Sequence, residues 1–191
     1  MTHQLPDPLN EQLLDLLRRY ALLKGNFALA SGEVTDTYLD VRRLALTGEG
    51  AAFLGERITD FVESRFPVLE GFGGMSIGAD PLVTSACISY SKRSGSNVSG
   101  ILVRKTPKPH GSHDWLLGCA DLTENAPILL LEDVVTSGSS SLTAARRIRK
   151  AGYSVKACLC VVDREAGGAE TLAKEGIALY SLTTLEKVLE E

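Results

Sequence analysis

ILLLEDVVTSGSS, residues 128–140, begins as an apolar run and ends in a turn of small residues. The run at 128–131 contains only isoleucine and leucine, which is typical of a strand buried on both faces of a parallel sheet. A turn rich in Thr, Ser and Gly follows, and residues 140–150 then have the apolar spacing of a helix. The free N–H groups of such a turn and helix start bind phosphate. The stretch therefore predicts a strand–turn–helix unit with an anion site at the turn.

Two acids at the start of this turn, Glu132 and Asp133, set a condition on the ligand. Carboxylates repel a phosphate placed against them, but they suit hydroxyl groups or a hydrated cation. A sugar phosphate meets both demands, with its phosphate on the turn and its hydroxyls on the acids. Two plainer interpretations remain open, because most Gly/Ser turns are ordinary helix starts and strand-end acids are commonly solvated. The turn is not a Walker A loop, since no Gly-Lys-Ser/Thr follows.

Outside this unit the chain alternates strands and helices, which predicts an α/β fold with a mostly parallel central sheet flanked by helices. Helices are expected over 9–23, 48–66, 81–92, 140–150 and 183–191, the last with capping-box spacing between Thr183 and Glu186. Gly25 would follow the first helix, and strands are expected around Phe27, Leu29, Tyr38 and Val41 (with a turn at Ser31-Gly32), at 98–103 and at 155–162. We predict one domain over 1–191: an N-terminal helix and substrate-side segment at about 1–45, an α/β core at about 46–182, and a C-terminal helix at 183–191.

Composition narrows the class of protein. An apolar content of 44% and a charged content of 23% are those of an ordinary globular chain. The first residues lack the features of a signal peptide and no apolar run could span a bilayer, so we expect a cytoplasmic protein with no membrane partner. The net charge of −4 argues against a general nucleic-acid binder. The four cysteines are expected to be buried hydrophobic residues rather than disulfide or zinc ligands.

A basic stretch interrupts this acidic chain. Residues 92–113 contain five Lys or Arg residues, two His residues and no acid. Such a run is usually a solvated face or loop, and it could equally clamp a small, highly charged anion. Composition does not decide between these two interpretations.

The 128–140 stretch resembles the phosphoribosyl pyrophosphate (PRPP) signature of type I phosphoribosyltransferases: an apolar run, two acids, two apolar residues and a small-residue loop. Four further segments resemble, in family order, those of the orotate-specific members: SGEVTDTYLDVRR (31–43), GADP (78–81), VRKTPKPHG (103–111) and DREAGG (163–168). They correspond to the substrate-side segment, the pyrophosphate loop, the mobile catalytic loop and the segment after the following strand. Ala30 and Glu33 depart from the pattern, because some members have basic residues there.

The resemblance implies transfer of the phosphoribosyl group of PRPP to N1 of orotate, with Mg²⁺ as cofactor, in pyrimidine biosynthesis. It implies catalytic roles for Lys108, His110 and Arg104 and orotate contacts from Thr136, Arg164 and Tyr38. The implied PRPP-binding residues are Arg104, Lys105, Lys108, His110, Glu132, Asp133, Val134, Val135, Thr136, Ser137, Gly138, Ser139 and Ser140. Mg²⁺ would be held by PRPP, near Glu132 and Asp133, with no direct protein ligand. The implied assembly is a homodimer with shared active sites.

Two alternatives share this fold. One is a phosphoribosyltransferase for another base, against which Arg164 and the 103–111 segment argue. The other is a non-catalytic PRPP-binding regulator, for which we would expect a basic nucleic-acid surface. A plain nucleotide-binding domain rests on analogy of fold alone.

Overall fold

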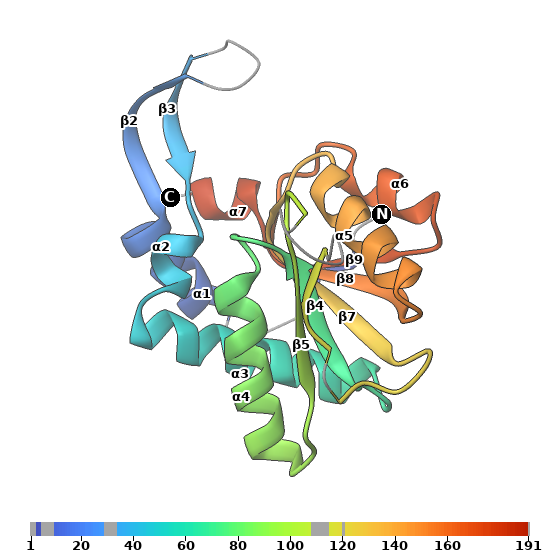
Figure 1. Ribbon diagram of the computed structural model, residues 1–191. Helices are drawn as coiled ribbons and strands as arrows, with labels where there is room; N and C mark the ends of the chain where they lie inside the picture. The colour runs from blue at the N-terminus through green and yellow to red at the C-terminus, as the bar shows by residue number, and fades with distance from the viewer. Residues whose placement is uncertain (1–2, 5–9, 29–33, 108–114, 120, 191) are drawn as a thin grey trace.

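A seven-stranded sheet lies at the centre of the protein (Figure 1), whose computed structural model describes residues 3–4, 10–28, 34–107, 115–119 and 121–190. The strand order is β1 (His3–Gln4), β9 (Ala178–Thr184), β8 (Ser154–Asp163), β7 (Pro127–Val135), β4 (Gly71–Met75), β5 (Ser99–Val103) and β6 (Leu116–Gly118). Every neighbouring pair is parallel except β5 with β6. The predicted α/β fold with a mostly parallel sheet is therefore confirmed.

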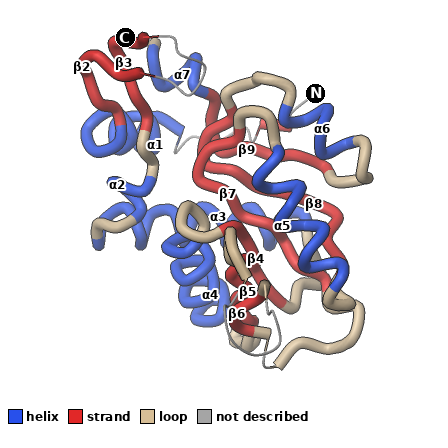
Figure 2. The backbone as a smooth tube through the Cα atoms, turned by 45° about the horizontal axis from the view of Figure 1, so that its top comes forward, coloured by secondary structure: helices blue, strands red, loops and turns tan. Residues whose placement is uncertain are grey.

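Helices cover both faces of this sheet (Figure 2). The first face carries α1 (Asn10–Leu16), the π-helical segment η1 (Leu17–Ala21), α2 (Arg42–Ala45), α3 (Gly48–Arg65) and α4 (Asp80–Ser94), and the second carries α5 (Ser139–Lys150) and α6 (Gly168–Ala173). Leu129 and Leu131 of β7 pack into the core of the first face, whereas Ile128 and Leu130 pack into that of the second. The apolar run at 128–131 is thus buried on both faces, as predicted. No helix in the described ranges is long and apolar enough to cross a membrane.

The cysteines follow the same alternation along β8. Cys158 and Cys160 lie two residues apart and are both buried in the core beneath α5 and α6. Cys87 and Cys119 are partly buried, and none of the four cysteines, all of which lie in the described ranges, forms a disulfide. Burial raises the pKa of the Cys87 thiol to about 11, so this side chain behaves as a neutral hydrophobic group. The expectation that the cysteines are buried is met for the β8 pair and partly met for the other two.

A separate antiparallel hairpin, β2 (Leu22–Ala28) and β3 (Val34–Leu39), projects from the body of the protein (Figure 1). The first helix ends earlier than predicted, because the chain enters β2 at Leu22, which pairs with Leu39. Gly25 consequently lies inside a strand, not after a helix. Val41 precedes α2 and is not in a strand, and the predicted turn at Ser31-Gly32 lies outside the described residues.

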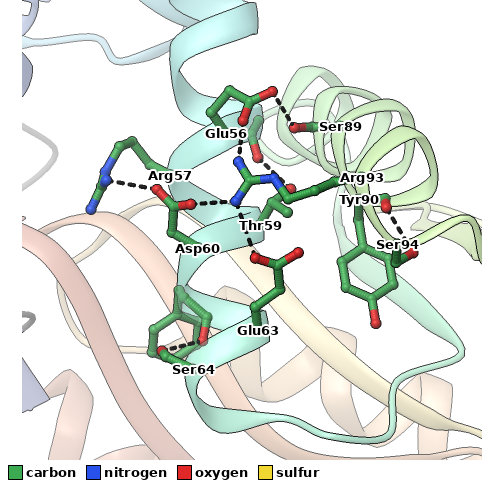
Figure 3. A network of polar contacts seen from close by, with 12 residues as sticks. Glu56, Arg57, Thr59, Asp60, Glu63, Ser64, Ser89, Tyr90, Arg93 and Ser94 are labelled. Carbon is green, nitrogen blue, oxygen red and sulfur yellow. Dashed lines mark hydrogen bonds and ion pairs between the residues drawn. The ribbon is translucent and has the colours of Figure 1, made fainter.

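Arg93, the second cation of the basic stretch, ties α4 to α3 (Figure 3). Its guanidinium contacts the carboxylates of Glu56, Asp60 and Glu63, the last at 3.1 Å. Ser89 adds a hydrogen bond from its hydroxyl to Glu56 at 2.9 Å. This cation therefore has a structural role and is not available to bind a ligand anion.

The C-terminal helix α7 (Leu185–Leu189) begins later than predicted. Its N-cap is Thr184, whose hydroxyl accepts a hydrogen bond from the Lys187 backbone N–H at 3.5 Å. The predicted cap, Thr183, is still inside β9, because that strand pairs with β8 as far as Thr184 and Asp163. The division of the chain near residues 45 and 182 stays a prediction.

Candidate active site

The sheet changes its direction of winding between β4 and β7. From β4 the chain runs through α4 to β5 on one side, whereas from β7 it runs through α5 to β8 on the other. In parallel α/β sheets the carboxyl ends of two such strands bound the crevice that binds ligands. A cavity of about 240 Å³ lies there, lined by Arg42, Met75, Ser76, Ile77, Gly78, Lys105, Glu132, Asp133, Val134 and Ser140. We call it the switch-point cavity.

The two acids of the signature lie inside β7 and not beyond its end, which corrects the predicted strand boundary. β7 continues through Val135 because it stays in register with β8, where Glu132 pairs with Cys160. Side chains alternate along a strand. Glu132 therefore turns towards α5 and accepts a hydrogen bond from the Ser141 hydroxyl at 2.9 Å.

Asp133 turns to the other face, towards the segment between β4 and α4. A β-carbon on Gly78 would lie 2.6 Å from Asp133 Oδ1, so any larger residue would force the Asp133 carboxylate to shift. Within the same segment the Ser76 hydroxyl donates to Asp80 Oδ1 at 2.8 Å, and the Ser76–Ile77 peptide bond is cis. The GADP segment singled out by sequence thus lies directly against the second acid.

Glu132 has an unusual electrostatic environment, with 5% of its surface exposed. Burial, and then the like charge of Asp133, raises the pKa of Glu132 to about 8, although the hydrogen bond from Ser141 opposes this effect. The ionised form is disfavoured because burial and the Asp133 carboxylate together outweigh the hydrogen bond from Ser141. A ligand that brings a cation or hydroxyl donors to this point would stabilise it.

The turn after β7 has the geometry that the sequence predicts. Gly138 has a φ of 76°, a left-handed conformation that glycine adopts without strain. A β-carbon there would lie 3.0 Å from Gly168 O, so the turn packs tightly against the start of α6. No side chain caps α5 at Gly138, and the first N–H groups of a helix have no partner within it. They are the donors that the predicted anion site requires.

Arg42 is a cavity residue that sequence reasoning did not single out. Its Nε and NH2 atoms donate to the two carboxylate oxygens of Asp40 at 2.6 and 2.9 Å. This bidentate contact holds the pKa of Asp40 below its ordinary value. The available signal was the Asp-x-Arg spacing in the 31–43 segment, but nothing in the sequence places it beside β7. Ser76 and Ile77 were missed for the same reason.

A second cavity of about 190 Å³ adjoins the first. Its lining residues are Thr35, Thr37, Tyr38, Leu39, Val134, Arg164, Leu185 and Leu189, and Val134 also lines the switch-point cavity. Arg164 is held at the end of β8, where its N–H donates to Val135 O at 2.9 Å. Tyr38 comes from the hairpin, with its ring 5.5 Å from that of Phe27. Two of the predicted orotate contacts therefore meet, whereas the third, Thr136, lies in the exposed turn and does not line this cavity.

The structure describes some of the predicted loop residues but not others. Lys105 lines the switch-point cavity, and the Arg104 backbone N–H donates to Trp115 O at 2.9 Å. Lys108 and His110 lie outside the described residues. Among the described residues, no group of three or more His, Cys, Asp or Glu is placed to hold a metal ion. A larger cavity, about 730 Å³, lies between the hairpin and α7, but it contains neither the acids nor the turn.

Comparison with known proteins agrees with this arrangement. The chain is 37% identical over 177 residues to the orotate phosphoribosyltransferase of Rhodopirellula baltica, across 91% of this chain and 90% of that protein. The chain belongs to the orotate phosphoribosyltransferase family. No family model matches it. The predicted membership of the orotate phosphoribosyltransferase family is thus confirmed.

Solved structures of the orotate phosphoribosyltransferase family have the same fold. The Mycobacterium tuberculosis enzyme in complex with Fe(III) dicitrate superposes with a TM-score of 0.83 and 30% identity, over 96% of this chain and 100% of that one. A structure of the same enzyme in complex with PRPP gives a TM-score of 0.77 and 27% identity, over 95% of this chain and 99% of that one.

Proposed function

We propose that the protein transfers the phosphoribosyl group of PRPP to N1 of orotate, giving orotidine 5′-phosphate and pyrophosphate. Family membership supports this activity. The observation that carries it is the meeting of two cavities at Val134, one bounded by the acids and the Gly/Ser turn and the other by Arg164 and Tyr38. A sugar phosphate and an aromatic acid bound in these cavities would face each other at that residue.

PRPP occupies the switch-point cavity in this proposal. Its 5′-phosphate accepts hydrogen bonds from the turn 136–140 and from the free N–H groups at the start of α5. Glu132 and Asp133 face the ribose hydroxyls from opposite sides of β7. The pyrophosphate lies along the segment between β4 and α4, where Lys105 supplies positive charge.

Magnesium fits this donor set, and we propose it as the cofactor. The buried Glu132 and its neighbour Asp133 place two carboxyl groups at the cavity. Mg²⁺ keeps several of its waters and binds through few carboxylates together with substrate phosphates. Held by PRPP, it would neutralise charge on the departing pyrophosphate, while the two acids orient its waters and the ribose hydroxyls.

In the reaction the C1′–O bond to pyrophosphate breaks, the C1′–N1 bond to orotate forms, and the N1 proton is released. Positive charge develops on the ribose as negative charge develops on the leaving group. Catalysis then depends on position and on cations near the pyrophosphate. We assign this role to Lys105 together with Arg104, Lys108 and His110, the last two from sequence alone; His110 would donate a hydrogen bond or proton.

Orotate occupies the second cavity. Its carboxylate would pair with the guanidinium of Arg164, whose planar fork matches a carboxylate. The ring would lie beside Tyr38, with Thr136 at the junction of the two ligands. We further propose a homodimer in which the subunits share active sites, as the resemblance implies.

The experiment that tests the function follows orotate absorbance with PRPP and Mg²⁺, with uracil, hypoxanthine and adenine in parallel. We expect orotate alone to be consumed, and Lys108→Ala to abolish turnover while PRPP still binds. Consumption of another base would favour the first alternative. Binding of PRPP with no base consumed would favour the non-catalytic regulator.

Arg164→Ala tests the substrate assignment separately. We expect it to raise KM for orotate by about tenfold or more, since a charge-assisted bidentate contact is lost, and to change KM for PRPP little. Equal losses for both substrates would contradict the role of Arg164 as the carboxylate partner.

A further inference from the structure

Arg147 of α5 contacts both ends of residues 104–115, which we call the basic segment. Its guanidinium carbon lies 3.6 Å from the ring centroid of Trp115, and its NH1 donates to the Arg104 carbonyl oxygen at 2.5 Å. Stacking of this kind favours the planar, delocalised guanidinium. The Arg147 side chain therefore contacts the first and the last residue of the segment 104–115.

These two end residues are themselves joined. β5 and β6 pair as far as Val103 with Leu116, and the bond from Arg104 N–H to Trp115 O continues this pairing by one step. Arg147 packs against that last step from the side of α5.

The contact bears on the active site through Lys105. This residue follows Arg104, and it lines the switch-point cavity that contains Glu132 and Asp133. Lys105 and Arg147 also line a neighbouring cavity of about 250 Å³, together with Ser139 and Ser140 of the first turn of α5. The helix whose start forms the phosphate turn thus also fixes the beginning of the basic segment.

The other arginines of α5 point elsewhere. Arg146 pairs with Glu175 at 2.6 Å, and Arg149 donates to the carbonyl oxygens of Val155 and Glu175. These contacts tie α5 to β8 and to the turn that follows α6, and they do not involve the basic segment. Arg146, adjacent in sequence and exposed, is therefore a matched control for Arg147.

We propose that Arg147 is a positioning residue for catalysis. It holds the Arg104–Trp115 step against α5 and so fixes Lys105 relative to the bound phosphoribosyl group. This inference rests on the proposed function, because it assigns to the positive charge of Lys105 a role in stabilising the pyrophosphate of PRPP.

Trp115 is the single tryptophan of the chain, so intrinsic fluorescence reports directly on the contact. Arg147→Met keeps the apolar stem but removes the guanidinium. We expect acrylamide quenching of Trp115 to rise about twofold, because the ring loses its cover. We expect kcat to fall about tenfold, a change of roughly 1.4 kcal/mol in the barrier, with KM for orotate nearly unchanged. Arg146→Met should leave quenching and kcat as in the wild type.

If Arg147 had a purely structural role, both arginine variants would lose thermal stability, and kcat would fall in both alike or in neither. Either result would overturn the proposal. Unchanged quenching in Arg147→Met would also overturn it. A second pair of variants tests the coupling: Trp115→Ala should reproduce the fall in kcat, and Arg147→Met should add little to it, since both remove one contact. Additive effects would contradict the proposal. If the wild-type protein consumes no orotate, the proposed function is wrong and the expected change in kcat cannot be tested. Acrylamide quenching of Trp115 still tests the contact between Arg147 and Trp115.

Discussion

Replacing Glu132 by glutamine should stabilise the ligand-free protein and weaken its binding of PRPP. Glu132 is buried, and its pKa is raised to about 8 by burial and by Asp133. In the folded protein the carboxyl group is therefore largely protonated at neutral pH, whereas in the unfolded chain it is ionised. Folding must then take up a proton, which disfavours the folded state.

The magnitude follows from this difference in pKa. Each pH unit above the ordinary glutamate pKa of about 4.3 costs about 1.4 kcal/mol, or roughly 4 kcal/mol at pH 7. The amide of glutamine removes that cost and can still accept the Ser141 hydrogen bond, but it brings two buried donors that cost about 1–2 kcal/mol. We expect a net gain of about 2–3 kcal/mol, which raises Tm by roughly 6–9 °C in a chain of this size.

The gain in stability from Glu132→Gln should increase as pH rises. Since the folded pKa is raised, the stability of the wild type is fully present below the unfolded pKa of about 4.3 and is lost as pH rises towards the folded value. The difference in Tm between Glu132→Gln and the wild type should therefore be small or reversed near pH 4 and should grow up to pH 8.

The assay is thermal unfolding of the ligand-free protein from pH 4 to pH 8, together with KM for PRPP. Glu124→Gln, at an exposed carboxyl group, is the control and should show no such trend. KM for PRPP should rise about tenfold in Glu132→Gln, because hydrogen bonds to a charged acceptor are lost. A Tm difference that does not vary with pH, or a variant less stable than the wild type at pH 8, would refute the reasoning.

Three further changes test other parts of the structure. Gly168→Ala would place a β-carbon 2.9 Å from the Thr136 carbonyl oxygen. We expect the free energy of unfolding in urea to fall by about 1–3 kcal/mol and KM for PRPP to rise. An unchanged KM would mean that the turn accommodates the β-carbon without loss of PRPP binding. Because the Arg42 guanidinium lowers the pKa of Asp40, their pairing stabilises the fold above the ordinary carboxyl pKa and is lost as pH falls through the lowered one. Arg42→Met should therefore flatten the decline in stability between pH 6 and pH 3, and a decline as steep as in the wild type would count against the pairing. Arg93→Ala leaves the carboxylates of α3 facing one another, so we expect a loss of about 1 kcal/mol at low salt that shrinks at high salt; a loss independent of salt would contradict an ionic contact.

The parts of the fold that sequence predicts well are those fixed by local chemistry. The run at 128–131 reads as a doubly buried strand because all four residues are apolar, and the structure buries them on both faces. The turn at 136–139 is predictable because Gly138 supplies the left-handed residue that it needs. In both cases the residues involved are adjacent in the chain.

The parts that sequence does not predict depend on partners far along the chain. Glu132 looks like a strand-end acid, yet it is buried because β8 continues to pair beside it. Arg93 looks like part of a ligand clamp, but it is held by the acids of α3. Arg42 lies some distance from the signature in sequence, and only the packing of α2 places it in the cavity. No local pattern contains this information.

The register between β7 and β8 has a consequence for redesign. Val135 pairs with Asp163, and Arg164 follows at once, so the turn and this arginine are separated by one interstrand step of about 4.8 Å. Backbone hydrogen bonds set that interval, and no side-chain substitution lengthens it. An engineer who wants the enzyme to accept a larger base has to make room on the opposite wall, at Thr35 to Tyr38. That wall belongs to a two-stranded hairpin outside the main sheet, so changes of shape there disturb the rest of the fold least.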